Sequence, residues 1–214
     1  MQPSRTPRRR ATLVNTRSQE TRRALTRAAL RLWSEGDFDA AYEASTVADI
    51  AQAAGVSKGS FYFHFANKEA ILLEMGSATI RAMIDQIDAG TAGDVPLHTL
   101  SEQVMTSMAR RTVRAPRVAA VRSSTLGFPT RALVGTPENP RLNVAFESLL
   151  RYGIKRGELS AQIDAEEGAA MLTAVTMEAI ARWGSGDRPA SWLRQTLLDR
   201  VAVILHGIGH LSDG

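Results

Sequence analysis

The stretch from Thr46 to Glu69, TVADIAQAAGVSKGSFYFHFANKE, constrains the fold more than any other part of the chain. Thr46 is a typical N-cap, and the apolar residues at positions 47, 50, 51 and 54 fall on one face of a helix. Gly55 then supplies the positive φ that ends a helix, and Ser57 can cap a second one. Two short helices joined by a tight glycine turn are typical of a helix-turn-helix.

The second helix of this stretch opens with Lys58, Gly59 and Ser60. Small residues let a helix end approach base edges in a DNA groove about 12 Å wide, which bulky residues would block. Longer polar side chains can reach phosphates on either side of that groove, and these are Lys58, Tyr62, His64 and Lys68. We therefore expect this helix to enter DNA, with Lys58 and Ser60 best placed for base edges.

The string IA..AGVSKG.FY.HF..KE, in unbroken order, resembles the DNA-binding segment of tetracycline-repressor-like (TetR-family) transcriptional regulators. With the helix before it, the resemblance covers about the first third of the chain. It implies an all-α fold, with an N-terminal three-helix helix-turn-helix domain and a larger C-terminal helical bundle for dimerisation and ligand sensing. It also implies DNA contacts from Thr46, Ser57, Lys58, Gly59, Ser60, Tyr62, Phe63, His64 and Lys68.

Charge is distributed unevenly along the chain. Residues 1–31 contain nine arginines and one acid, 9 − 1 = +8, whereas the rest carries 17 Lys and Arg against 21 Asp and Glu, 17 − 21 = −4. A basic end beside a helix-turn-helix favours a polyanionic partner, although an arginine-rich tail that only aids solubility would give the same count. We expect residues 1–16 to form a disordered basic arm, free to lie along phosphates or in a minor groove.

The remaining pattern predicts helices throughout, with no strand-like alternation. We expect a DNA-binding domain over 17–68, whose first helix spans about 18–35, and treat 36–45 as a connection. An effector-binding and dimerisation domain follows over 69–214. Its expected helices span about 68–90, 96–114, 116–125, 143–156, 165–183 and 190–206, with 127–140 mostly loop.

The last two expected helices are apolar on more than one side, which indicates burial against several neighbours. We predict a homodimer interface there, since palindromic sites on DNA require two copies, although ordinary core is the alternative. The residues chosen for this interface are Leu172, Val175, Ala179, Leu197, Val201, Ile204, Leu205 and Ile208.

Adaptable and aromatic side chains in the second domain could line a ligand pocket. These are Met105, Met108, Phe128, Phe146, Met171, Met177 and Trp183. Each of these residue types is more often core than pocket, so the existence of a pocket rests on the family resemblance.

Other classes of function lack support in the sequence. There is no cysteine, no run of apolar residues long enough for a membrane span, and no set of residues that argues for catalysis. His206 and His210 have the spacing of a metal pair, but no further ligand completes a site.

We thus expect a cytoplasmic, non-enzymatic bacterial regulator without a cofactor, a repressor released from a palindromic operator by a small, largely apolar effector. The alternatives are a DNA-binding protein that acts architecturally without an effector, or an activator.

Overall fold

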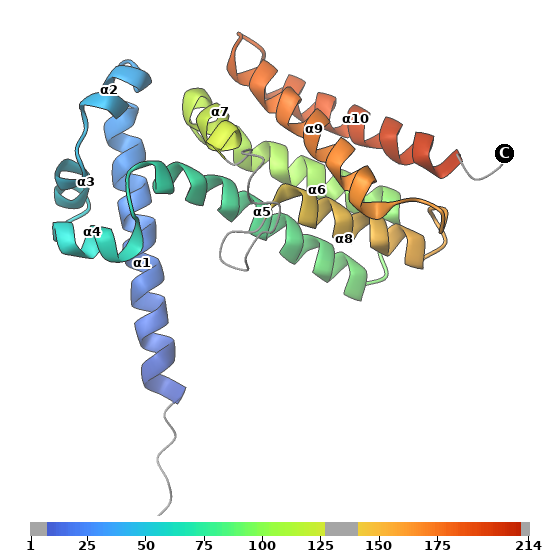
Figure 1. Ribbon diagram of the computed structural model, residues 1–214, viewed down its shortest axis with the longest axis horizontal. Helices are drawn as coiled ribbons and strands as arrows, with labels where there is room; N and C mark the ends of the chain where they lie inside the picture. The colour runs from blue at the N-terminus through green and yellow to red at the C-terminus, as the bar shows by residue number, and fades with distance from the viewer. Residues whose placement is uncertain (1–7, 127–140, 211–214) are drawn as a thin grey trace, which may run out of the picture. The chain divides into compact units, whose positions relative to one another are not determined.

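The structure is a computed structural model that describes residues 8–126 and 141–210 of the chain. Those residues form ten α-helices and no strand (Figure 1), which confirms the all-α prediction. The helices are α1 (Arg8–Trp33), α2 (Phe38–Ala44), α3 (Val47–Ala53), α4 (Lys58–His64), α5 (Glu69–Ala92), α6 (Leu97–Thr112), α7 (Arg117–Leu126), α8 (Leu142–Lys155), α9 (Ala165–Gly184) and α10 (Ala190–His210).

The chain divides into an N-terminal unit, residues 1–71, and a C-terminal unit, residues 72–214. The division lies within α5, slightly beyond the domain boundary expected at 68/69. Within the described residues, no helix is both long enough and apolar enough to span a membrane.

In the N-terminal unit, α1 packs against α2 and α3, and α3 packs against α4. The centre of this packing is Trp33, which is fully buried and meets the rings of Phe38 and Tyr42 at 6.0 and 4.9 Å between centroids. Its indole N–H donates to Ser45 Oγ at 2.8 Å. A large aromatic group with a satisfied polar atom therefore holds the end of α1 to α2.

Helix α2 lies in the segment 36–45, where the sequence pattern predicts only a connection. Asp37 caps it by accepting the Ala40 N–H at 2.8 Å, and the buried residues Phe38 and Tyr42 lie one turn apart. The N-terminal unit thus contains one short helix more than the three-helix expectation. A helix of seven residues with only two buried side chains gives too little apolar periodicity to be identified.

Helix α1 also begins earlier than expected. It starts at Arg8 instead of near residue 18, so residues 8–16 of the predicted disordered arm are helical. Residues 1–7 lie outside the described residues. The helix has 26 residues, which corresponds to about 39 Å of length.

The C-terminal unit is a helical bundle. Helix α9 packs against α7, α8 and α10, while α6 packs against α8 and α10. Its core is apolar, with Leu100, Met105, Phe146 and Leu149 all fully buried. Close approach at one crossing depends on glycine, because a Cβ on Gly184 would lie 1.9 Å from Val121 Cγ2.

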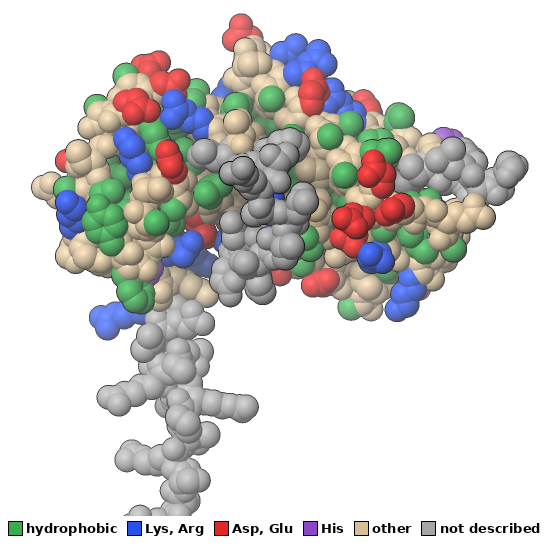
Figure 2. Space-filling view, in the orientation of Figure 1, with side chains coloured by type: hydrophobic (Ala, Val, Ile, Leu, Met, Phe, Trp, Pro, Cys, Tyr) green, Lys and Arg blue, Asp and Glu red, His purple; other side chains and the backbone are tan. Residues whose placement is uncertain are grey.

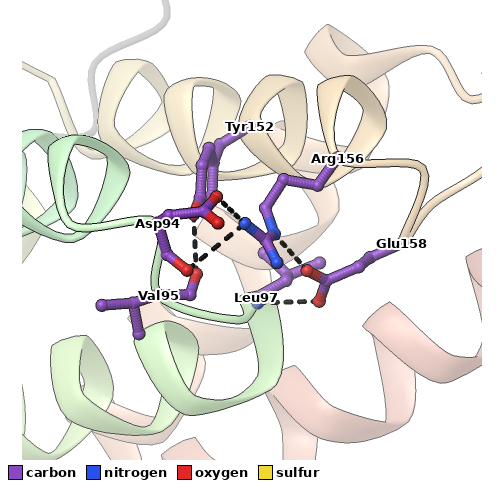
Figure 3. Close-up of polar contacts among 6 residues, drawn as sticks. All are labelled: Asp94, Val95, Leu97, Tyr152, Arg156 and Glu158. Carbon is purple, nitrogen blue, oxygen red and sulfur yellow. Dashed lines mark hydrogen bonds and ion pairs between the residues drawn. The ribbon is translucent and has the colours of Figure 1, made fainter.

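A group of polar contacts, called here the α6 clasp, joins the turn before α6 to the end of α8 (Figure 3). Arg156 donates to the carboxylates of Asp94 and Glu158, and the other Glu158 oxygen accepts the Leu97 N–H at 2.8 Å. Tyr152 Oη donates to the Val95 carbonyl at 2.7 Å. Pro96, at the N-cap of α6, provides no side-chain cap, so Glu158 caps this helix from a distance in sequence.

We predict that Glu158→Ala lowers the free energy of unfolding by about 1–2 kcal/mol, the range of a lost helix cap. The matched control is Glu147→Ala, which removes an exposed pair with Arg151 one turn away and should cost less than about 0.5 kcal/mol. Urea unfolding of both variants makes the comparison, and equal effects would contradict the capping role.

The same contacts give a pH dependence. The hydrogen bond from Arg156, followed by that from the Leu97 N–H, lowers the pKa of Glu158 below its usual 4.5 despite partial burial. The unfolded chain therefore binds this proton more readily than the folded chain. The stabilisation is present above pH 4.5 and is lost as the pH falls through the lowered pKa.

Candidate nucleic-acid interface

Helix α3 begins at a complete capping box. Thr46 Oγ1 accepts the Asp49 N–H at 3.2 Å, and Asp49 Oδ2 accepts the Thr46 N–H at 2.8 Å. The Thr46 hydroxyl also donates to Asp49 Oδ2 at 2.7 Å, and this bond, followed by the one from the Thr46 N–H, lowers the pKa of Asp49. Two otherwise free backbone donors are satisfied, so the start of α3 is fixed by local chemistry alone.

A glycine turn sets the direction of α4. Gly55 has φ of 70°, the left-handed conformation that residues with a Cβ rarely adopt. The Gly55 and Val56 N–H groups donate to the carbonyls of Gln52 and Ala51, both at 3.0 Å. Ser57 then caps α4 by accepting the Ser60 N–H at 3.0 Å. The predicted helix-turn-helix is present with the predicted caps.

The two sides of α4 differ sharply. Phe61, with Phe65 just beyond the helix end, is buried, at 0% and 2% exposure, whereas Tyr62 and Phe63 are exposed at 52% and 81%. In Figure 2, hydrophobic and basic side chains reach the surface next to each other over this part of the N-terminal unit. Ser57, Lys58 and Gly59 are exposed too, while Ser60 and His64 are half-buried. One side anchors the helix and the other is left for a partner.

Packing does not explain the glycine at position 59. A Cβ there would meet only Ser57 Oγ, at 3.8 Å, and the backbone is not in the positive-φ region. Since alanine favours a helix more than glycine does, glycine lowers the intrinsic stability of α4. A glycine that the fold does not require, on the exposed side of this helix, is consistent with close approach to another molecule.

Two of the residues predicted to contact DNA make side-chain hydrogen bonds within the N-terminal unit. Lys68 Nζ donates to the carbonyls of Tyr42, Glu43 and Ser45 at the end of α2, and lies 4.4 Å from the Tyr42 ring centroid. Its three donors are thus engaged with backbone carbonyls, not directed to a phosphate. The Thr46 hydroxyl is likewise engaged, since it bonds to Asp49 as both donor and acceptor.

Arg22 also contributes to this region, although it is not among the residues predicted from the sequence. Its guanidinium lies 4.8 Å from the Phe65 ring centroid, and Nη1 donates to the His64 carbonyl at 3.4 Å. These two contacts of Arg22 therefore hold α1 to the end of α4. Its position in the sequence could have indicated this role. Arg22 falls three and seven residues before the buried Leu25 and Ala29, so it lies on the side of α1 that faces inward.

The residues predicted to line a pocket occupy different positions. Met105, Met108, Phe146 and Trp183 are buried in the core of the C-terminal unit, and Met177 packs against that core. Met171 is instead 48% exposed on α9, so it does not face the interior. Phe128 lies outside the described residues.

The predicted dimer residues are mostly inside a single chain. Leu172, Ala179, Leu197, Val201 and Leu205 belong to the core of the C-terminal unit, Ile204 packs against that core, and Val175 is half-buried. The side chain of Ile208 is not described. Side chains buried within one chain cannot contact a second one, so among the predicted residues with described side chains Val175 and Ile204 keep surface for a second copy. Met171 and Val203 are large apolar side chains on α9 and α10, at 48% and 71% exposure.

Metal binding gains no support from the part of the chain that is described. No group of three or more histidine, aspartate or glutamate side chains gathers there in a way that could hold an ion. His206 is exposed near the end of α10, and the side chain of His210 is not described.

His64 gives the N-terminal unit a pH dependence. Burial, and secondarily the nearby positive charge of Arg22, lower the pKa of His64 from its usual 6.5. The unfolded chain then binds more protons than the folded chain, so we predict that the free energy of unfolding falls as the pH drops from about 6.5 through the lowered pKa. Urea titrations between pH 7.5 and pH 5 measure this. His64→Gln should flatten the dependence, and an unaltered slope would exclude His64 as its source.

The N-terminal part of the chain matches a known family. Residues 25–75 match the family described as "Bacterial regulatory proteins, tetR family". An uncharacterized HTH-type transcriptional regulator of Bacillus subtilis (strain 168), YerO, is 32% identical over 88 residues, which are 40% of this chain. This chain spans 29% of the length of that relative.

Solved structures share the fold over most of the chain. FadR of Thermus thermophilus, a TetR-family transcriptional repressor solved with lauroyl-CoA, superposes with a TM-score of 0.67 at 22% identity, covering 87% of this chain and 94% of that one. TylP of Streptomyces fradiae, a TetR regulator, gives 0.64 at 24% identity, covering 92% and 90%. These likenesses establish the fold, and the match over residues 25–75 covers the helix-turn-helix. Residues 25–75 therefore carry the helix-turn-helix of the TetR family, and the chain as a whole has the fold of TetR-family regulators of known structure.

Proposed function

We propose that this protein is a sequence-specific repressor that binds a palindromic DNA operator as a homodimer and is released by a small molecule. The observation that carries the proposal is the two-sided character of α4. Phe61, and Phe65 after the helix, anchor it, while Lys58, Gly59, Tyr62 and Phe63 face outward on a helix that follows a capped glycine turn. Such a surface suits the major groove, where a helix presents small and polar groups to base edges.

Two copies are part of the proposal because a palindrome has two half-sites, which two recognition helices read about 34–36 Å apart. Met171 and Val203 support this, since both are large apolar side chains left exposed on the last two long helices. A second copy that covers them would remove this surface from water. The site of action would be the cytoplasm, where bacterial DNA lies.

Release by an effector is supported by the fold of the C-terminal unit. The Thermus FadR structure of this fold holds lauroyl-CoA, and in the present chain the core around Met105, Phe146 and Trp183 offers adaptable and aromatic groups. A ligand would change DNA affinity only through its differential affinity for the DNA-competent and DNA-incompetent states of the dimer.

The test is selection of genomic fragments by the purified protein, followed by binding measurements on the best fragment across a range of salt concentrations. Enrichment of a palindromic site supports a specific regulator. Recovery of DNA without sequence preference would favour an architectural role instead, and would end the repressor proposal. Reporter expression from the enriched site then separates a repressor from an activator.

Lys58 and Lys68 form a matched pair for the phosphate contacts. Lys58 is exposed, whereas the Lys68 ammonium is held by three carbonyls of the N-terminal unit. We predict that Lys58→Ala reduces the slope of log K against log salt by about one. Lys68→Ala should leave the slope unchanged and lower the free energy of unfolding by about 1–2 kcal/mol. The reverse pattern would assign the phosphate contact to Lys68.

Gly59→Ala separates binding from folding. The added methyl has room in the isolated protein, so stability should be unchanged or rise by up to about 1 kcal/mol. The same methyl would stand between α4 and the base edges, so operator affinity should fall about tenfold. Melting temperature and operator affinity, measured on one preparation, check both parts. Full retention of affinity would show that the backbone at position 59 stays away from DNA.

A further inference from the structure

Helix α9 carries three buried side-chain polar atoms that lack a hydrogen-bond partner: Thr173 Oγ1, Thr176 Oγ1 and Trp183 Nε1. We call these residues the α9 polar row. Thr176 is fully buried and Trp183 is 3% exposed. Buried polar groups in folded proteins are nearly always hydrogen-bonded, so each unbonded group needs a physical explanation. Three unbonded groups on one helix indicate a shared explanation.

The row lies along one side of the helix. Seven residues make almost two helical turns, so Thr176 and Trp183 point in nearly the same direction, about 10 Å apart along the axis. Thr173 lies about one turn before Thr176, at its flank. The contact of Gly184 with Val121 places α7 along this flank, whereas α10 reaches the other side, where Arg200 donates to the Val175 carbonyl. The row therefore faces the interior of the C-terminal unit.

Hydroxyls on other helices of the C-terminal unit are satisfied within their own helix, unlike those of Thr173 and Thr176. The hydroxyls of Ser77, Thr79 and Thr112 donate to the carbonyl four residues earlier, at 3.0, 3.4 and 3.0 Å. Such bonds are the ordinary way to satisfy a helical hydroxyl. Thr173 and Thr176 make no bond of this kind, so their hydroxyls remain available to another molecule.

The Trp183 indole N–H cannot donate a hydrogen bond to Arg117, the charged side chain that lies against its ring. The Arg117 guanidinium lies 4.8 Å from the ring centroid and donates to the carbonyls of Trp183, Gly186 and Arg188. A guanidinium has no acceptor, so it cannot receive the indole N–H. The partner of Trp183 Nε1 must bring an acceptor atom of its own.

The surroundings also restrict the charge of that partner. Ser77, Ser101, Ser123 and Thr176 are buried in the described part of this unit, where no aspartate, glutamate, lysine, arginine or histidine is buried. The half-buried Arg117 beside Trp183 donates from both terminal nitrogens to backbone carbonyls, so an ionised ligand would lose its hydration without gaining a free ionic partner. Met177, Ile180 and their neighbours offer apolar surface beside the row.

We propose that the α9 polar row binds an uncharged effector with hydrogen-bond acceptor oxygens, such as a lactone, an ester or a ketone on an apolar chain. This rests on the proposed ligand-responsive function and narrows the effector from a largely apolar molecule to a neutral one with acceptors. Trp183 Nε1 donates to one acceptor, and the threonine hydroxyls bond to the others.

The first test needs no ligand. Thr176→Val keeps the shape of the side chain and removes a hydroxyl that has no partner, so the ligand-free protein should melt about 2–4 °C higher. The control, Thr112→Val, removes a hydroxyl that is already bonded and should melt at the same temperature or lower. If Thr176→Val is destabilised like the control, the hydroxyl already has a partner in the ligand-free protein, and the proposal is overturned.

The second test uses a panel of probes matched in chain length: uncharged γ-alkyl lactones and methyl esters, their carboxylates, and hydrocarbons without oxygen. We expect the neutral, oxygen-bearing probes to raise the melting temperature most, and Thr176→Val to weaken their binding about tenfold while Thr112→Val does not. Trp183→Phe should weaken it as well. Preference for carboxylates, equal binding of hydrocarbons, or no binding of any neutral probe would overturn the assignment.

Operator binding is measured on the same preparations. A protein that selects a palindromic site but ignores every neutral probe retains the proposed DNA function and loses this inference. A protein that binds the neutral probes without selecting a DNA site keeps this inference and loses the proposed DNA function. The two proposals therefore fail separately.

Discussion

Burial of Phe61 and Phe65 is the constraint on which the rest of the N-terminal unit depends. These two rings, together with the Arg22 contacts, fix the rotation of α4 about its own axis. Once that rotation is set, two of the three residues between them, Tyr62 and Phe63, have no place in the core and must face water or a partner. Exposure of an apolar ring at 81% is unfavourable in an isolated protein. The surface is thus a consequence of the anchoring, and a partner that covers it would relieve the exposure.

Local chemistry made this part of the chain predictable. The caps at Thr46 and Ser57 and the positive φ of Gly55 act within a few residues, so a sequence can reveal them without knowledge of the tertiary structure. The role of Lys68 could not be found in this way. Its partners are carbonyls more than twenty residues earlier, at the end of a helix that is itself too short to give a periodic signal.

The C-terminal unit shows a different limit of sequence reasoning. An apolar stripe identifies which residues leave water, but not whether the neighbour that covers them belongs to the same chain. Leu172 and Leu197 are therefore correctly expected to be buried, although they pack within the chain and not on its surface. Polar partners that are distant along the chain cannot be predicted from such a pattern either, as the bond between the Leu97 N–H and the Glu158 carboxylate illustrates. The pattern fixes the inward side of each helix, while the pairing of helices decides what that side meets.

The three tryptophans report on three separate environments. Trp33 is buried in the N-terminal unit with its N–H bonded to Ser45, and Trp183 is buried in the C-terminal unit with no acceptor. The Trp192 ring centroid lies 5.9 and 4.9 Å from the guanidinium groups of Arg182 and Arg188. Indole emission depends on polarity and hydrogen bonding around the ring. A chain that keeps only Trp33 would therefore signal unfolding of the DNA-binding unit by fluorescence. A chain that keeps only Trp183 would signal events inside the helical bundle, without any added label.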